Sequence, residues 1–179
     1  MKLVIELPSR EQVLRQNRQR WAEVLADRTL VDLPFRVETN CHGTLLMTPP
    51  PSGHHSSLQG EIAFQLRSIL AGHALPECPI STLDGVRAAD VGWYSSERFD
   101  LVKGQIAFEV APEICVEVIS PSNIDAEMDC KKHLYFEAGA EEVWYCREDG
   151  RMEFYATSNP DTLITQSSLC PGFPVRIEI

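Results

Sequence analysis

The chain has 179 residues, of which 44% are hydrophobic and 23% are charged, and its formal net charge is −10. This length and composition fit one soluble globular domain, and no apolar run approaches the roughly 20 residues that a membrane-spanning helix needs. The negative charge argues against a protein that coats nucleic acid non-specifically, because such binding depends on many lysine and arginine contacts to phosphate.

The first residues, MKLVIELPSREQ, contain an apolar stretch that is too short for a signal peptide. The six cysteines are scattered without a CxxC pair, so neither a disulfide framework nor a zinc site is indicated. We therefore expect a cytoplasmic protein with reduced, mostly buried thiols.

Residues 9–27 are predicted to form a helix, because three apolar residues recur at helical spacing: Leu14, Trp21 and Leu25. The arginines between them indicate a solvated face. The next segment, FRVETNCHGTLLMTP, predicts a hairpin that turns at Asn40 to Gly43. A second amphipathic helix is predicted over residues 56–71, with Gly72 at its end.

The rest of the sequence predicts a sheet with a further helix. GVRAADVGWY and GQIAFEV are predicted strands, separated by the polar segment SSERFD. A central strand over residues 114–119 is followed by a helix over residues 123–138 that Gly139 closes, and then by the strands EEVWYC and RMEFYA. This order predicts an α/β fold with a mixed β-sheet flanked by helices.

One carboxylate interrupts the apolar central strand. Alternate residues of a strand face opposite sides of the sheet, so Glu117 shares its face with Cys115 and Ile119. Both faces are otherwise apolar, which is typical of a strand covered on both sides. An ionised carboxylate there costs several kcal/mol unless a cation or a strong hydrogen-bond donor compensates it. Glu117 therefore needs a partner.

The helix that follows offers a partner on its apolar stripe. Five residues fall on one helical face: Ile124, Met128, Lys131, Tyr135 and Ala138. Lys131 lies in the middle of this stripe, whereas Lys132 is rotated about 100° from it and is expected in solvent. Taken alone, the pair of Glu117 and Lys131 is best interpreted as a buried salt bridge between helix and strand.

A second acid changes this interpretation. Asp90 lies in the predicted strand GVRAADVGWY, upstream of the Glu117 strand and expected beside it. Acids on two neighbouring strands with a lysine above them are the arrangement that metal-assisted phosphodiester cleavage requires. The carboxylates hold Mg²⁺, and the lysine orients a water or offsets charge in the transition state.

At these residues the sequence resembles the PD-(D/E)XK nuclease superfamily, and within it a large bacterial family of restriction-endonuclease-like proteins of unknown function. The resemblance lies in AADVGWY, CVEVISPS, KKHLYFEAG and GAEEVW, and it extends to VETNCHGTLLMTPPPSGHHSSLQGEI and to a predicted final strand, SLCPGFPVRIEI. It covers residues 36–179, and residues 1–35 form a predicted N-terminal helical extension. The combined spacing is specific where each fragment alone is weak.

The resemblance implies a restriction-endonuclease-like fold in which Asp90 and Glu117 bind Mg²⁺ or Mn²⁺ and Lys131 is the catalytic lysine. Two positions depart from the pattern. Ala89 replaces the proline expected before the aspartate, which affects backbone rigidity more than chemistry. Ile119 stands where a strict Glu-x-Lys triplet has its lysine, so the resemblance places the lysine on the helix, as the stripe does independently.

Three further residues are secondary candidates for the site. Glu38 resembles the hairpin glutamate of the family, and a surface position fits its sequence equally well. Glu61 lies beside the apolar stripe of its helix and could reach a metal, but a solvated position is favoured. His55 matches a family histidine before that helix, and helix capping is favoured over a phosphate contact. Tyr135 and Trp144 are expected in the core.

The first functional interpretation is a Mg²⁺-dependent endonuclease that hydrolyses nucleic acid with a metal-activated water, with DNA favoured over RNA. A homodimer is expected, because cutting both strands of a duplex needs two active sites. The negative charge favours an alternative, a catalytically silent nuclease fold that binds nucleic acid or protein. An ordinary α/β protein with a buried bridge between Glu117 and Lys131 is a third interpretation, which requires Asp90 to lie far from Glu117.

Overall fold

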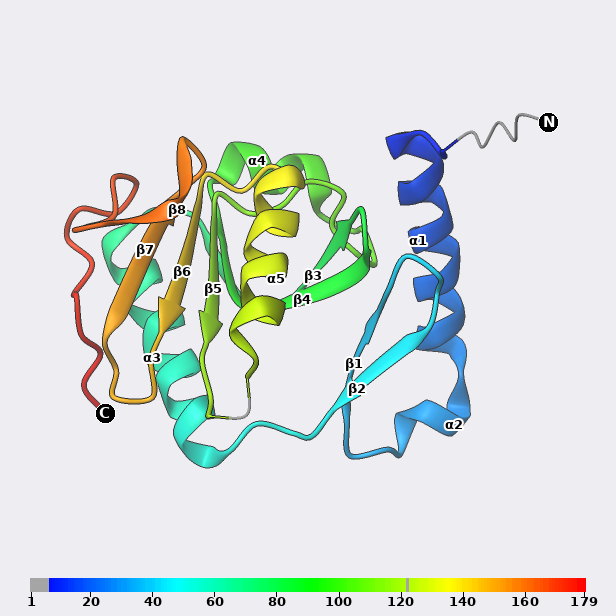
Figure 1. The fold of residues 1–179 in the computed structure, drawn as a ribbon, viewed down its shortest axis with the longest axis horizontal. Helices are drawn as coiled ribbons and strands as arrows, with labels where there is room; N and C mark the ends of the chain where they lie inside the picture. The colour runs from blue at the N-terminus through cyan, green and yellow to red at the C-terminus, as the bar shows by residue number, and fades with distance from the viewer. Residues whose placement is uncertain (1–6, 122) are drawn as a thin grey trace.

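The protein folds around a mixed six-stranded β-sheet, seen in a computed structural model that describes residues 7–121 and 123–179 (Figure 1). Neighbouring strands follow one another along the chain: β3 (His73–Thr82), β4 (Gly85–Tyr94), β5 (Ile114–Val118), β6 (Glu142–Cys146), β7 (Met152–Ala156) and β8 (Asn159–Ile164). Strands β5 and β6 are parallel, and the other neighbours are antiparallel. The predicted α/β fold with a mixed sheet flanked by helices is confirmed.

The remaining elements of residues 7–121 and 123–179 are five helices and a small hairpin. The hairpin consists of β1 (Arg36–Thr39) and β2 (Leu45–Thr48). The helices in the described ranges are α1 (Arg10–Ala26), α2 (Arg28–Val31), α3 (Gly53–Ile69), α4 (Ser96–Val102) and α5 (Asp125–Glu137). None of these helices is long and apolar enough to cross a membrane.

Helices α3 and α5 cover opposite faces of the sheet (Figure 1). On one face, Leu66 of α3 belongs to the same hydrophobic cluster as Val116 of β5. On the other face, Tyr135 of α5 clusters with Cys115 of the same strand. Every residue of β5 is buried, because both of its faces are covered. Strand alternation then places Glu117 on the face that α5 covers.

Helix α1 and the β1–β2 hairpin lie beside the turn between β3 and β4 (Figure 1). Asn17 of α1 donates hydrogen bonds to Oγ of Ser81 at 2.9 Å and to the carbonyl of Thr82 at 2.8 Å. Oγ1 of Thr39 accepts a hydrogen bond from the backbone N–H of Val86 at 2.9 Å. These contacts fix β1 against β4, where the side chains of β1 can reach the main sheet.

The first helix follows the prediction closely, but its buried stripe differs. Leu25 is 56% exposed, and the buried side chains of α1 are Asn17, Trp21 and Val24. The predicted division between an extension over residues 1–35 and a nuclease domain over residues 36–179 stays a prediction. The first six residues of that extension lie outside the described part of the chain.

Two predicted strands are wrong. Residues 104–110 are irregular, and Phe108 makes one isolated bridge with Ile80. The closing segment SLCPGFPVRIEI likewise forms no strand and contributes an isolated bridge between Arg176 and Arg151. Both segments have apolar residues at strand-like spacing, but each meets the sheet at one point only.

Two strands and one helix start were not evident from the sequence. Strand β3 contains Pro76 and Pro79, which lack a backbone donor and are tolerated because β3 is the edge of the sheet. Strand β8 is mostly exposed and has no apolar alternation. Helix α3 begins at Gly53, earlier than predicted, because Oγ of Ser52 accepts a hydrogen bond from the backbone N–H of His55 and caps the helix.

Candidate active site

Glu117 lies beneath α5 with its side chain 6% exposed. Its Oε1 accepts a hydrogen bond from the hydroxyl of Tyr135 at 2.6 Å and lies 3.0 Å from Nζ of Lys131. These two residues are one turn apart on α5, so the helical stripe presents both to the same carboxylate. The structure thus brings Glu117 and Lys131 together as the alternation and the stripe predict, and Tyr135 bonds to the cluster from the core.

Lys131 has a second carboxylate partner. Its Nζ lies 3.1 Å from Oε1 of Glu38 on β1 and donates a hydrogen bond to the carbonyl of Ala88 at 3.4 Å. Glu38 is held in place by the backbone N–H of Ala88 at 2.9 Å and by Arg87, whose Nη1 is 3.2 Å away. Glu38 therefore belongs to the cluster, and Glu117 is not the sole compensation for the buried ammonium.

Asp90 lies where β4 and β5 diverge. Val91 pairs with Val116, so Asp90 and Glu117 are the next residues of the two antiparallel strands. Oδ2 of Asp90 accepts a hydrogen bond from the backbone N–H of Val118 at 2.7 Å. The carboxylate thus satisfies a strand donor just beyond the last β4–β5 pair, which fixes its orientation beside Glu117.

The other oxygen of Asp90 faces the side-chain nitrogens of Arg36 and His55. Its Oδ1 lies 2.8 Å from Nη2 of Arg36 and 3.2 Å from Nε2 of His55. The same nitrogen of Arg36 is 2.7 Å from Oε2 of Glu77. Nε2 of Gln59 donates to Oε1 of Glu77 at 3.0 Å and to the carbonyl of Asp90 at 2.8 Å. These contacts surround Asp90 with an ordered shell.

Sequence reasoning missed three members of this shell: Arg36, Glu77 and Gln59. One signal could have found Arg36, because it stands two residues before Glu38 and therefore on the same face of β1. Glu77 adopts a left-handed conformation with φ of 51°, which is uncommon for a residue other than glycine. Its position depends on the pairing of β3 with β4, which the sequence does not reveal.

Burial and like charge shift the ionisation of the acids. Burial raises the pKa of Glu117 to about 7; Lys131 opposes this rise, and the nearby Asp90 carboxylate adds to it. Burial would also raise the pKa of Asp90, but the hydrogen bond with His55 and the charge of Arg36 hold that pKa below its usual value. Burial disfavours the charged form of Lys131, yet the two carboxylates beside it raise its pKa. Glu117 is therefore the acid whose negative charge is least compensated.

The network holds more carboxylates than fixed cations. Its members are the cations Arg36, Arg87 and Lys131 and the acids Glu38, Glu77, Asp84, Asp90 and Glu117. With every carboxyl ionised, three positive and five negative charges leave a net charge of −2. One divalent ion would neutralise this excess, and carboxylate oxygens are the ligands that Mg²⁺ and Mn²⁺ prefer. The residues present therefore fit such an ion.

Two secondary candidates are His55, which differs from its favoured interpretation, and Glu61, which lies outside the cluster. The capping role favoured for His55 is wrong, because Ser52 caps α3 and the imidazole of His55 faces Asp90 instead. Glu61 accepts a hydrogen bond from Gln65 on its own helix at 2.7 Å. Among the described residues, no hydrogen bond or ion pair joins Glu61 to Asp90.

A separate group of possible metal ligands lies on the surface. Single ligand atoms of Asp129, His133 and Asp161 lie within 4.8 Å of one another. Nζ of Lys132 is 2.7 Å from Asp129 and 3.5 Å from Asp161, so an ammonium already supplies positive charge there. The solvated position predicted for Lys132 is wrong: the residue is 4% exposed, because β8 and the Tyr155 ring cover it.

A mixed sheet with acids on two neighbouring strands, and a lysine on the helix after the second, defines the class of PD-(D/E)XK-like folds. The chain belongs to the Uma2 family, described as "Putative restriction endonuclease", whose model matches residues 27–174. A solved structure with the same fold is that of "a putative nuclease belonging to DUF820" from Anabaena variabilis. The two share 18% sequence identity with a TM-score of 0.67, over 87% of this chain and 93% of the other. No curated protein matches the sequence.

Proposed function

We propose that the protein is a metal-dependent endonuclease that hydrolyses phosphodiester bonds of DNA in the cytoplasm. The observation that carries this proposal is the meeting of Asp90 and Glu117, on neighbouring strands, with Lys131 on the covering helix. Membership in a family described as "Putative restriction endonuclease" supports hydrolysis of nucleic acid. The excess of carboxylates over fixed cations in the network, of which Glu77 and Asp84 are partly exposed, supports Mg²⁺ or Mn²⁺ as the cofactor.

The side chains of the cluster have different roles in the proposed reaction. Asp90 and Glu117 would hold the metal, with Glu38 as a nearby third acid. When bound, the ion supplies a Lewis acid that activates the attacking water and offsets charge on the phosphate. Lys131 presents its ammonium beside Glu117, where it orients that water or stabilises the transition state. Tyr135 fixes one oxygen of Glu117, which orients the ligand.

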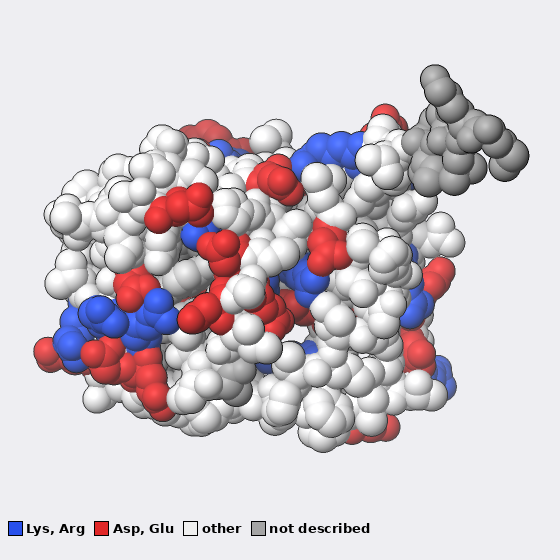
Figure 2. All heavy atoms as spheres, viewed as in Figure 1, with Lys and Arg blue, Asp and Glu red and all other residues white. Residues whose placement is uncertain are grey.

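A second candidate function is a catalytically silent module that binds nucleic acid or protein. It is favoured by the charge of −10. Figure 2 shows acidic side chains spread over the middle of one face, around α5, with Lys and Arg gathered near the ends of β6 and β7. Such a surface repels the phosphate backbone except where a metal or a local basic group compensates.

Replacing Asp90 with Asn tests the proposal directly. We expect wild-type protein to bind Mn²⁺, measured by isothermal titration calorimetry, and to nick plasmid DNA when Mg²⁺ is present. D90N should lose both properties while circular dichroism shows an intact fold. D161N is the matched control, because it removes one acid of the separate surface group. Loss of Mn²⁺ binding in D161N but not in D90N would assign the metal to that group and overturn the proposal.

Arg36 should compete with the metal for Asp90, because its guanidinium lies 2.8 Å from Oδ1. We expect R36Q to bind Mn²⁺ at least about tenfold more tightly, since two unit charges about 4 Å apart interact by about 4 kcal/mol near a protein surface. R176Q is the control, because Arg176 pairs with Asp149 at the surface, outside the cluster. Weaker Mn²⁺ binding in R36Q than in R176Q would show that Arg36 supports the metal site instead.

The proposed enzyme is a homodimer, since cutting both strands of a duplex needs two active sites. Helix α1 is the proposed contributor to the interface, because the family model begins after it, at residue 27. One chain has a mass of 20.1 kDa, and light scattering should give about twice this mass. A mass of one chain at high protein concentration would contradict this prediction.

A further inference from the structure

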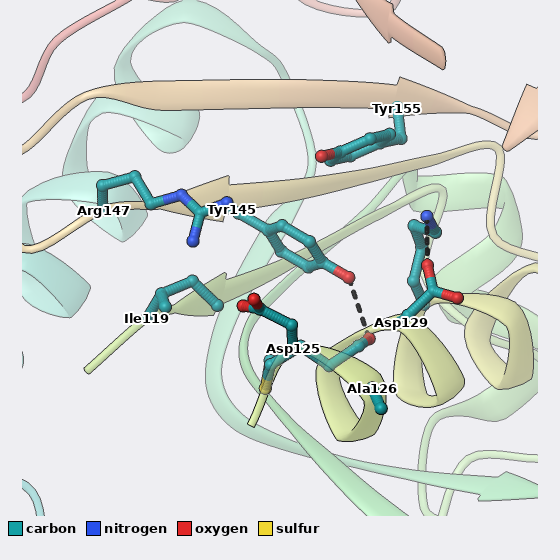
Figure 3. A pocket seen from close by; sticks show the side chains of 9 residues that line it. Ile119, Asp125, Ala126, Asp129, Tyr145, Arg147 and Tyr155 are labelled. Carbon is teal, nitrogen blue, oxygen red and sulfur yellow. Dashed lines mark hydrogen bonds and ion pairs between the residues drawn. The ribbon is translucent and has the colours of Figure 1, made fainter. Parts of the chain in front are cut away.

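We propose that a pocket beside the acidic cluster binds one nucleobase of the DNA strand, next to the phosphate that is cleaved. This inference rests on the proposed function. The pocket has a volume of about 390 Å³. Figure 3 shows it between the end of β5, the start of α5 and two strands of the sheet, with Ile119, Asp125, Tyr145, Arg147 and Tyr155 in its wall. Lys132 also lines the pocket.

The pocket and the proposed active site share two elements. Tyr145 of β6 is the direct partner of Glu117 in the parallel pairing of β5 with β6. Neighbouring strands lie about 4.8 Å apart, so the two side chains are adjacent on the face that α5 covers. Ile119 continues the same face of the chain two residues beyond Glu117. A base in the pocket would therefore lie within about one nucleotide of a phosphate at Glu117.

One wall of the pocket is aromatic. The rings of Tyr145 and Tyr155 lie with their centroids 5.2 Å apart and their planes at 58° (Figure 3). The hydroxyl of Tyr145 donates a hydrogen bond to the carbonyl of Met128 at 2.8 Å, which fixes its ring. Nζ of Lys132 lies 4.5 Å from the centroid of the Tyr155 ring. Tyr145 is buried, whereas the partly exposed ring of Tyr155 offers a stacking surface for any base.

The polar groups of the pocket suit the edge of a base. Asp125 projects from the first turn of α5 into the space in front of Tyr145, and Arg147 lies across that space (Figure 3). Nη2 of Arg147 donates to Glu153 at 2.7 Å, which holds the guanidinium in place. A carboxylate accepts from amino groups of a base, and a guanidinium donates to its ring nitrogens and carbonyls.

The charges in the wall balance. Asp125 and Asp129 oppose Lys132 and Arg147, so the lining is neutral when all four are ionised. A phosphate would meet two carboxylates, and a cationic ligand would meet two basic groups. A flat, neutral heterocycle with donors and acceptors on its edge fits the balanced lining better than either ion. The base must leave its stack to enter, so single-stranded or locally opened DNA is the matching substrate.

The test compares two fluorescein-labelled single strands of equal length, one with bases and one fully abasic, by fluorescence anisotropy without metal. Wild-type protein should bind the strand with bases about tenfold more tightly, the factor expected for one stacked base. Y155A should lose this difference, and Y155F, which keeps the ring, should retain it. D125N, at an exposed position that does not depend on packing, should reduce the difference several-fold.

Equal affinity of the wild type for the two strands, or no binding of either, would overturn the proposal. A mononucleotide that binds as tightly as the strand would also overturn it, because the pocket would then serve a free nucleotide. Failure of the proposed function looks different. Base-dependent binding without any metal-dependent nicking would contradict the proposed nuclease activity but support the base pocket. Metal-dependent nicking with equal affinity for both strands would contradict only the base pocket.

Discussion

Replacing Lys131 with Met should lower the free energy of unfolding by about 3 to 5 kcal/mol, the usual cost of breaking a buried ion pair from one side. The ammonium lies 3.0 Å from Glu117 and 3.1 Å from Glu38, and its side chain is 13% exposed. Methionine fills a similar volume but leaves both carboxylates without this cation. Urea denaturation of K131M and wild type measures the difference.

The adjacent lysine provides the control. Lys132 is also buried, but its partners Asp129 and Asp161 are 57% and 71% exposed and stay solvated when the ammonium is removed. K132M should therefore cost about 1 kcal/mol or less through its ion pairs. Equal losses in K131M and K132M would show that the cluster around Glu117 does not depend on the charge of Lys131.

The loss of unfolding free energy in K131M, relative to the wild type, should become smaller as the pH falls. Without the ammonium, the pKa of Glu117, already raised to about 7 by burial, rises further above its value in the unfolded chain. The folded state then binds more protons than the unfolded state in the window between those two values. The free energy of unfolding of K131M therefore increases as the pH falls through this window, and its deficit relative to the wild type narrows at pH values above about 7, where Glu117 of the wild type is still ionised. Added Mg²⁺ at neutral pH should likewise restore part of the stability.

Local periodicity was sufficient to predict the centre of this site. Alternation in β5 predicts that Glu117 shares its face with Cys115, and the helical stripe of α5 predicts that Lys131 points toward the sheet. Both are observed. Asp90 could be placed beside Glu117 because its segment, GVRAADVGWY, has the pattern of a strand and precedes β5 in the chain. Two residues that follow such regular patterns need no knowledge of distant contacts.

The outer parts of the site depend on contacts that no local pattern encodes. Glu77 reaches Arg36 only because β3 pairs with β4 along its whole length, and the prolines of β3 conceal it as a strand. His55 faces Asp90 and Ser52 caps the helix, a difference that depends on where α3 begins, which was predicted three residues too late. Lys132 is buried by β8, whose sequence is polar.

Replacing Glu117 with Gln should reduce metal-dependent cleavage by more than about a hundredfold, beyond the cost of losing an outer-shell partner of a metal. The free energy of unfolding should change by less than about 1 kcal/mol. Lys131 keeps Glu38 at 3.1 Å, the Gln carbonyl can still accept from Tyr135, and the repulsion with Asp90 is relieved. Mg²⁺ should raise the melting temperature of the wild type but not that of E117Q.

The same substitution at Glu142 should have the opposite effects. Glu142 is a fully buried acid on β6 whose oxygens accept hydrogen bonds from Trp144, Ser168 and Leu169. A Gln amide group turned toward these donors would lose bonds to a charged acceptor, so E142Q should cost about 1.5 to 3 kcal/mol. Nicking by E142Q should match the wild type below its melting temperature, because Glu142 has no contact with the proposed metal ligands among the described residues.

The paired substitutions separate an enzyme from a structural salt bridge. If Glu117, rather than Glu38, carried the compensation of Lys131, E117Q would leave the buried ammonium poorly compensated and cost about 3 to 5 kcal/mol, as K131M does. Marked destabilisation of E117Q, together with no effect of Mg²⁺ on wild-type melting, would therefore assign the pair a purely structural role. If E117Q is as stable as the wild type but no longer responds to Mg²⁺, Glu117 is a metal ligand of the proposed enzyme. The fold then does not need this carboxylate, and its role is to bind the cation.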